Sequence, residues 1–435
     1  MRILTDNKNM KNSTKKDQKK NKKTSKNKKK INWLPIIIIV ACFAVGLGLG
    51  FGIKYAVKKA KAKNLDVAFY QLPEEMKSEL EKRINEGYNG KIKIVDLTDE
   101  TFDARKIARK YDLFFSWNGS AVTKLERYAE DFPVEWYGNM PSSLRRHAGK
   151  TLPIILDHYE LSYYREGRIN AGLNFPQNIV ELQAYLEKMK SYVFSPFFCA
   201  GANDDTLLAL VGALVEAFGG TKSYNLMIDN FRKKPSLTQT IDLQLSTTGN
   251  KEDEFTIRSV LDLLRGWQEN GLTHPNWFTA KQGDVDAFLE DNQVAVLFTS
   301  LSTHRNMKYR LVSKLDADRV PAFSAKINHG LIAPSIVAVK LTDVDYFDSI
   351  LIDLVTEASQ KDLSNITKLG PVTSRGQAYD RQADDVRFLA ASCVDGPLPP
   401  LGLATNQTNK DAKHKLAEEI RYYLKSGATT GLITR

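Results

Sequence analysis

The chain has 435 residues and a formal net charge of +11 at pH 7, but its positive charge is concentrated near the N-terminus. Residues 1–32 hold 13 Lys and Arg against two acidic residues, and five more lysines follow within residues 54–63. Residues 64–435 hold 44 basic and 49 acidic side chains, whereas a duplex-binding protein would be expected to carry a basic patch on its folded part. The charge distribution therefore argues against nucleic acid as a partner, and a hydrophobic content of 42% predicts a globular core.

The first predicted element is an apolar helix over residues 33–53, a segment without a charged residue. Its length is what a helix needs to cross the hydrocarbon core of a bilayer. Trp33 and Tyr55 lie at its edges, as interfacial aromatic residues do. Residues 11–30 carry eleven lysines, against five after the apolar segment, and the more basic side stays in the cytoplasm. We therefore expect a cell-membrane protein with a single span, a cytoplasmic N-terminus and its main domain periplasmic or extracellular.

The flanking segments complete this predicted topology. Residues 1–32 are a basic tail that is too polar to fold, and residues 54–64 are a basic juxtamembrane linker. The "IVAC" ending at Cys42 resembles the cleavage box of bacterial lipoproteins, in which the cysteine is lipidated. The apolar residues after Cys42 favour an uncleaved signal anchor, but lipidation stays open. Either anchor leaves the main domain outside the cytoplasm.

Alternating strands and helices follow the linker. We predict strands at 65–70, 91–97 and 112–117, with helices at 73–87 and 101–111 between them. This order predicts parallel strands joined by right-handed crossovers. Because ligands collect at the carboxyl ends of such strands, "SWNGS" at 116–120 is a candidate site.

The rest of the chain continues as mixed α/β structure. The predicted elements are two strands within 152–166, strands at 192–198 and 293–300, and helices at 178–190, 204–220, 252–271, 284–292, 345–360, 383–393 and 410–427. No long linker divides residues 65–435, which predicts one large bilobal unit, expected to be monomeric.

Catalytic and metal-binding motifs are not found in the sequence. It has no HExxH, GxSxG, P-loop or GxGxxG motif, and its six histidines are scattered without ligand spacing. We therefore expect no enzymatic activity, no cofactor and no metal. Cys199 and Cys393 could form a disulfide outside the cytoplasm, but two separate buried thiols are the favoured interpretation.

Four segments together resemble one protein family. They are "LPIILDHYELSYYREGRINAGLNFPQNIVELQAYLEKMK" (152–190), "FFCAGANDDTLLALVGALVEAFGG" (197–220), "DVDAFLEDNQVAVLFTSLS" (284–302) and "KLGPVTSRGQAYDRQADDVRFLAAS" (368–392). In this order they resemble the bacterial extracellular solute-binding proteins of the maltose-binding type, family 1. These proteins capture sugars and related solutes for ABC importers.

The resemblance implies a two-lobed periplasmic-binding-protein-like fold of type II with hinge strands. It implies a first lobe of about 65–157 and 326–372 and a second lobe of about 161–325 and 373–435. A small polar solute, most plausibly a carbohydrate, would bind in the cleft, and the lobes would close over it by hinge bending. The implied partners are that solute and an ABC transporter permease.

The resemblance also implies site residues, with an aromatic and a polar side chain from the first lobe, a carboxylate from the hinge, and polar groups from the second lobe. These are Trp117, Asn118, Asp157, Asn203, Asp204, Ser300, Ser302, Thr303 and Gly402. Other roles stay open: Trp117 as a core residue, Asp157 as a hydrogen-bonding hinge residue, and Ser300–Thr303 as a helix cap. Acidic residues such as Asp204 at a helix start equally offset the helix dipole.

Departures from the family pattern weaken the sugar prediction more than the fold prediction. Asn178 and Ile179 replace the usual Thr-Trp, and "SLSTHR" follows the strand at 293–300 where aromatic residues are usual. An alternative hypothesis is therefore a surface sensor or scaffold that reuses the fold without transport. A third hypothesis is a membrane-anchored hydrolase on an α/β scaffold.

Overall fold

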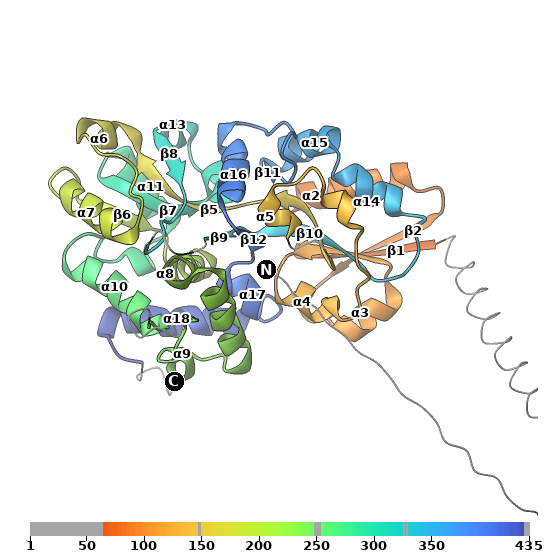
Figure 1. The fold of residues 1–435 in the computed structure, drawn as a ribbon, viewed down its shortest axis with the longest axis horizontal. Helices are drawn as coiled ribbons and strands as arrows, with labels where there is room; N and C mark the ends of the chain where they lie inside the picture. The colour runs from red at the N-terminus through yellow and green to blue at the C-terminus, as the bar shows by residue number, and fades with distance from the viewer. Residues whose placement is uncertain (1–63, 147–148, 248–253, 325–326, 328, 430–435) are drawn as a thin grey trace, which may run out of the picture. The chain divides into compact units, whose positions relative to one another are not determined.

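The computed structural model describes residues 64–146, 149–247, 254–324, 327 and 329–429 (Figure 1). These residues belong to one compact unit. The predicted tail, apolar helix and most of the linker lie outside the described residues. In the part that is described, none of the helices combines the length and apolar character that a bilayer span requires.

The β-structure consists of two larger sheets and one short pair of strands. The first sheet has the strand order β11-β4-β10-β3-β1-β2, formed by Gly370–Pro371, Leu152–Leu156, Ser335–Lys340, Leu113–Trp117, Asn64–Tyr70 and Lys91–Leu97. The second sheet has the order β6-β7-β5-β8, formed by Ser195–Cys199, Val294–Ser300, Tyr159–Tyr164 and Leu315–Asp318. The pair is β12-β9, formed by Asp395–Leu398 and Gly330–Ile332.

The predicted parallel start of the first sheet is confirmed. Strand β1 pairs in parallel with β2 and with β3, so that Val67 lies opposite Ile94 on one side and Leu113 on the other. Helix α2 (Glu74–Gly87) connects the first two strands and begins after Pro73. Its buried residues Met76, Leu80 and Ile84 recur at helical spacing, which turns one face of the helix toward the sheet.

Helices cover both faces of the first sheet. On one face, α3 (Ala104–Lys110) and α4 (Ser120–Glu126) contribute buried apolar residues to the same core cluster as Phe114. On the other face, α2, α14 (Asp348–Leu354) and α15 (Glu357–Thr367) pack against Phe115 and its neighbours (Figure 1). The sheet is therefore the middle layer of three, and its strand ends lie between the two helical layers.

Strand β10 was not among the predicted elements, yet it occupies the centre of the first sheet. It runs antiparallel to β3 and to β4, and all six of its residues are buried. Its sequence "SIVAVK" is short and apolar, so no period distinguishes a strand from a buried helix there. Its partners lie more than 170 residues earlier in the chain, and only the folded protein brings them together.

The second sheet has a core of its own, which also includes helices of the later chain. The helices packed there are α7 (Ile179–Met189), α8 (Asp204–Lys233), α10 (Ile257–Glu269), α11 (Gln282–Glu290), α17 (Leu401–Asn406) and α18 (Lys410–Ser426). Cys199 belongs to this core and Cys393 to the first, and both are free thiols. The favoured interpretation of two separate buried thiols is confirmed.

Helix α8 is longer than the predicted helix at 204–220, because a second helix continues directly from the first. Gly220 has φ 72° and ψ −174°, a left-handed conformation that only glycine adopts without strain. The helix predicted at 204–220 therefore does end at its last residue, but the chain resumes helical geometry directly and continues to Lys233.

Two short segments lead from the first sheet to the other β-structure, one to the second sheet and one to the short pair of strands. Asp157 and His158 join β4 to β5, and Ala333 and Pro334 join β9 to β10. The backbone N–H of Asp157 donates a hydrogen bond to the carbonyl of Pro334 at 2.8 Å, so these two connections run side by side. The predicted lobe boundaries stay predictions.

Candidate functional site

The carboxyl ends of the parallel strands are the first candidate region. Strand β3 ends at Trp117, and α4 begins at Ser120, with Asn118 and Gly119 forming the turn between them. The N–H of Asn118 donates to the carbonyl of Ser335 at 2.7 Å, which fixes this turn against β10. Such a turn places polar backbone groups at the strand ends, where α/β proteins commonly bind ligands.

The side chain of Gln407 occupies this region. Its Nε2 donates to the hydroxyl of Ser116 and to the carbonyl of Trp117, both at 3.1 Å. Its Oε1 accepts from the N–H of Ala121 at 3.1 Å, in the first turn of α4. Gln407 is only 3% exposed, and all its side-chain polar atoms are paired. The amide thus takes the hydrogen bonds that a polar ligand at these strand ends would use.

The backbone around Gln407 also contacts the strand ends. The carbonyl of Gln407 accepts hydrogen bonds from Gln71 Nε2 at 3.1 Å and from the Tyr70 hydroxyl at 3.4 Å. A Cβ atom at Gly119 would lie 2.4 Å from Oε1 of Gln407 and 2.6 Å from the carbonyl oxygen of Leu403. Helix α17 therefore packs directly on the turn after β3, and glycine at position 119 is required by this close approach.

The predicted site residues fall into three groups. Trp117 and Asn118 lie at the strand ends, half-buried beside Gln407. Asp157, Ser300, Ser302 and Thr303 lie together where β4 and β7 meet their next elements. Asn203, Asp204 and Gly402 lie where α8 meets α17 and α18. Within the described ranges, no hydrogen bond joins one of these groups to another.

The second group is held together by Asp157. Its Oδ2 accepts from the Ser302 hydroxyl at 2.5 Å, and its Oδ1 accepts from the N–H groups of Ser302 and His158. Burial raises the pKa of Asp157 above its ordinary value, because the charged form is deprived of water. Ser300 accepts from the N–H of Thr303 at 3.2 Å and caps α12 (Leu301–Asn306), so the capping role of Ser300 is confirmed.

The two acidic residues at the start of α8, Asp204 of the third group and its neighbour Asp205, form ion pairs with residues of α18. Asn203 caps α8 through the N–H of Thr206 at 3.1 Å. Asp204 pairs with Arg421 at 2.8 Å and with His414 at 2.9 Å, and Asp205 pairs with Lys413 at 3.0 Å. Gly402 is buried, and a Cβ atom there would lie 3.1 Å from Oδ1 of Asp205. These side chains therefore bind α17 and α18 to the start of α8.

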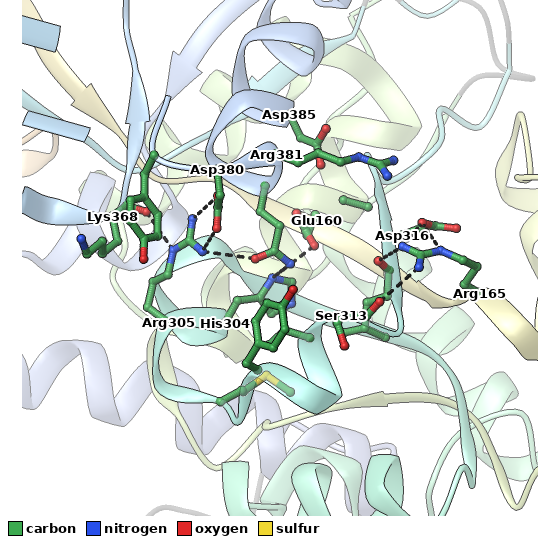
Figure 2. A pocket seen from close by; sticks show the side chains of 17 residues that line it. Glu160, Arg165, His304, Arg305, Ser313, Asp316, Lys368, Asp380, Arg381 and Asp385 are labelled. Atoms are coloured by element: carbon green, nitrogen blue, oxygen red, sulfur yellow. Dashed lines mark hydrogen bonds and ion pairs between the residues drawn. The ribbon is translucent and has the colours of Figure 1, made fainter. Parts of the chain in front are cut away.

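A second candidate region is a cavity of about 710 Å³, which the sequence did not predict. Its walls come from β5, β8, α12, α13 (Tyr309–Val312) and the start of α16 (Arg381–Ser392). Figure 2 shows Arg305 and Asp380 on one side of it and Arg165 and Asp316 on the opposite side. These residues lie far apart in the sequence and belong to no motif, so no sequence signal could have identified them.

Buried polar side chains form the base of the cavity. Glu160 Oε2 lies 2.5 Å from Nε2 of His158, and Glu160 Oε1 accepts from the Ser162 hydroxyl at 2.5 Å. His304 Nε2 lies 3.2 Å from the same hydroxyl. Burial opposes the charge on Glu160, but the two histidines and Ser162 outweigh it and hold the pKa of Glu160 below its ordinary value. Ser162 is inaccessible, so this cluster shapes the base and presents no exposed nucleophile.

Ion pairs fix the two side walls. Arg305 holds both carboxylate oxygens of Asp380, at 2.7 and 2.9 Å, and its Nε donates to the carbonyl of Lys368 at 2.8 Å. Arg165 donates to Asp316 at 2.8 Å, and Arg168 donates to the other oxygen of that carboxylate at 3.0 Å. The bidentate pair of Arg305 with Asp380 has a fixed geometry, and two arginines hold the carboxylate of Asp316, so both walls are preorganised.

The remaining polar groups of the cavity belong to α16. Arg381 is exposed and, in the part of the chain that the structure describes, makes no hydrogen bond and no ion pair. Asp385 lies one turn further along the helix, and burial together with the negative charge of Glu160 raises its pKa to about 6. No group of three or more His, Cys, Asp or Glu residues within the described ranges is placed to hold a metal ion.

Comparisons with known proteins identify structures with a similar fold, but no relative by sequence. No protein-family model matches the sequence, and no curated protein matches it. The bacterial solute receptor AcbH, described with an exclusive preference for β-D-galactopyranose, is similar over 84% of this chain and 93% of its own, with a TM-score of 0.66 and 12% identity.

Two further solved structures agree with the first. RafE from Streptococcus pneumoniae, in its apo form, is similar over 85% of this chain and 95% of its own, with a TM-score of 0.60 and 14% identity. A chitin oligosaccharide binding protein is similar over 85% of this chain and 100% of its own, with a TM-score of 0.54 and 14% identity. The described part of this chain therefore has the α/β fold of the bacterial solute-binding proteins.

Proposed function

We propose that the chain is a membrane-tethered, extracytoplasmic solute-binding protein that captures a small polar solute, a carbohydrate, for an ABC importer. The observation that carries the proposal is the fold, because the similar structures include proteins described as binding β-D-galactopyranose, chitin oligosaccharide or raffinose, and each is similar over more than four-fifths of this chain. In this proposal the two sheets with their helices act as two lobes, and the segments around Asp157 and Pro334 act as the hinge.

Titration of the full-length protein in detergent tests the proposal. Ligand classes would include neutral sugars, acidic sugars, polyols, amino acids and peptides, each followed by thermal unfolding. A ligand that binds only the folded state raises the free energy of unfolding by about 2.7 kcal/mol at a hundredfold excess over its dissociation constant. A rise with one or more sugars supports the proposal, and no response to any sugar contradicts it.

The proposed topology places residues 64–435 on the non-cytoplasmic face, with the apolar segment 33–53 as anchor. Tethering would keep the domain at a high local concentration beside its permease. Protease added to intact cells should digest the main domain and spare a tag placed before residue 32. Digestion of the tag with the main domain left intact would show the opposite orientation.

A second candidate function is a surface sensor or scaffold, and the position of Gln407 favours it. A buried amide takes the polar groups at the strand ends, so this fold no longer offers them freely to a solute. A sensor or scaffold would bind no sugar, but would retain a protein partner after crosslinking in intact cells. A transport receptor would crosslink to a permease and release that contact with the solute state.

A further inference from the structure

The cavity beside α16 carries an excess of uncommitted positive charge. Four basic residues and four acidic residues line it. Three of the acidic residues are already paired: Asp316 with Arg165, Asp380 with Arg305, and Glu160 with His158. Arg168 adds a further cation to Asp316.

Two charged side chains of the cavity, Arg381 and Asp385, make no hydrogen bond and no ion pair among the described residues. The ammonium of Lys368, in contrast, donates to the backbone carbonyl of Asn365. With Arg168 counted, five basic side chains face four carboxylates, one of which also pairs with His158, so the cavity favours an anionic ligand.

Two tyrosines in the lining give the cavity an apolar surface. Tyr309 is 85% exposed and Tyr379 is 45% exposed, although large aromatic side chains are mostly buried elsewhere in this protein. The ammonium of Lys368 lies 3.9 Å from the centre of the Tyr379 ring, and this cation–π contact holds the ring in place. A sugar ring presents apolar CH faces that stack on aromatic rings and hydroxyls that bond to charged groups.

The size and rigidity of the cavity also fit a small ligand. A volume of about 710 Å³ lies within the usual range of about 300–1,000 Å³ for ligand pockets. The base is fixed by buried hydrogen bonds and both side walls by ion pairs, so little ordering is needed on binding.

We propose that this cavity, and not the strand ends occupied by Gln407, binds the solute, and that the solute is a sugar bearing an anionic group. Arg381 binds the carboxylate or phosphate, Tyr309 covers one face of the ring, and Asp385 accepts from hydroxyls. This inference rests on the proposed function and names its ligand class and its location.

Isothermal titration of the full-length protein in detergent tests the inference. Four probes distinguish the sources of the anion: galactose, galacturonate, galactose 6-phosphate and inorganic phosphate. Arg381→Gln should lower the affinity for the acidic sugars by about tenfold or more, because a charge-assisted hydrogen bond to the anion is lost. Tyr309→Ala should lower the affinity for the same sugars by about fivefold or more, because the surface on which the sugar ring stacks is lost. Both side chains are exposed, so both variants should fold.

Arg109→Gln is the matched control, since Arg109 is an exposed arginine on α3 that lies outside the cavity lining. It should leave all four affinities unchanged. Acidic sugars that bind equally well to wild type and to Arg381→Gln would overturn the cavity site while leaving the proposed function standing.

The remaining outcomes also decide the question. Preference for galactose over both acidic sugars, or inorganic phosphate binding as tightly as galactose 6-phosphate, would overturn the ligand class. Loss of acidic-sugar binding in Asn118→Ala, with Arg381→Gln unaffected, would return the site to the strand ends. No binding of any sugar would overturn both the inference and the proposed function.

Discussion

The strand ends of the first sheet and the cavity beside α16 are both lined by polar groups, but a buried amide occupies the first, whereas charged side chains of the second lack a partner among the described residues. At the strand ends, the amide of Gln407 pairs with Ser116, Trp117 and Ala121. In the cavity, Arg381 has no hydrogen-bonding or ion-pair partner among the described residues, and Asp385 has a raised pKa. The position of a site within a fold family therefore does not ensure that its polar groups are free to bind a ligand.

The largest expected effect breaks the packing at the strand ends. In Gly119→Ala the new methyl group would collide with the side chain of Gln407 and with the backbone carbonyl of Leu403. Because the carbonyl belongs to α17 and cannot rotate away, we expect the free energy of unfolding to fall by about 3 kcal/mol. Chemical denaturation would measure this fall in the free energy of unfolding.

Gly283→Ala is the control for that substitution. Gly283 lies within α11, and no atom approaches its Cβ position within 4 Å. Alanine there should raise the free energy of unfolding by up to about 1 kcal/mol through helix propensity. Equal effects of the two substitutions would mean that α17 does not pack on the turn after β3.

Gln407→Ala tests the hydrogen bonds themselves. The change leaves the N–H of Ala121 and the carbonyl of Trp117 without their side-chain partner in a buried position. We expect a loss of about 2 kcal/mol in the free energy of unfolding. Gln183→Ala on the outer side of α7, where the side chain bonds only to Glu187, should change it by less than about 0.5 kcal/mol. A loss no larger than the control would show that the amide is not an essential contact.

Asp385→Asn tests whether the carboxyl group of Asp385 in the cavity has a raised pKa. Burial, and next the charge of Glu160, raise the pKa of Asp385 from 3.8 to about 6, while Arg381 and His158 oppose the shift. The folded state thus binds the proton more tightly than the unfolded state, so wild-type stability falls as pH rises from about 4 through about 6.

The Asp385→Asn variant has no carboxyl group at this position, so its stability should not fall in this way as the pH rises. Above pH 6 it should be more stable than wild type by about 1 kcal/mol, after allowance for solvent screening of a part-exposed group, and the difference should vanish near pH 4. Denaturation series at pH 4 and pH 8 would measure this difference. A difference that grows toward low pH would show that the carboxylate is stabilised in its charged form instead.

The smallest expected effect concerns a surface contact near the strand ends. Lys410 Nζ lies 3.6 Å from Oδ2 of Asp99, and the lysine side chain is mostly exposed. Lys410→Ala should therefore lower the free energy of unfolding by less than about 0.5 kcal/mol, and this difference should disappear in high salt. A larger, salt-independent loss would show that this ion pair is a principal contact between α18 and the first sheet.

Local signals in the sequence predicted the elements at the start of the fold. The helix at 73–87 has a proline at its start, a glycine at its end and apolar residues at helical spacing, and it appears as α2. The strand at 91–97 was predicted at the bounds of β2, and the predicted end of the helix at 204–220 coincides with the break in α8 at Gly220. In these cases the information lies within a few residues of the element itself.

Other elements depend on contacts that no local pattern records. The predicted helix at 345–360 is two helices, α14 and α15, because the chain turns at Val355 and Thr356. The short helix α17 has six residues and follows a proline-rich stretch, so it has no measurable period. Its position is fixed by packing against α8 and the strand ends.

The charge division of the chain, the α/β class and the alternating elements of the first sheet can be derived from the amino-acid sequence, because they follow from composition and from periods of a few residues. The contact of Gln407 with Ser116, 291 residues earlier in the chain, and the meeting of Glu160, Arg305 and Arg381 around one cavity arise from the folded structure. Side chains so far apart carry no shared motif, and their meeting depends on the packing of whole helices and strands.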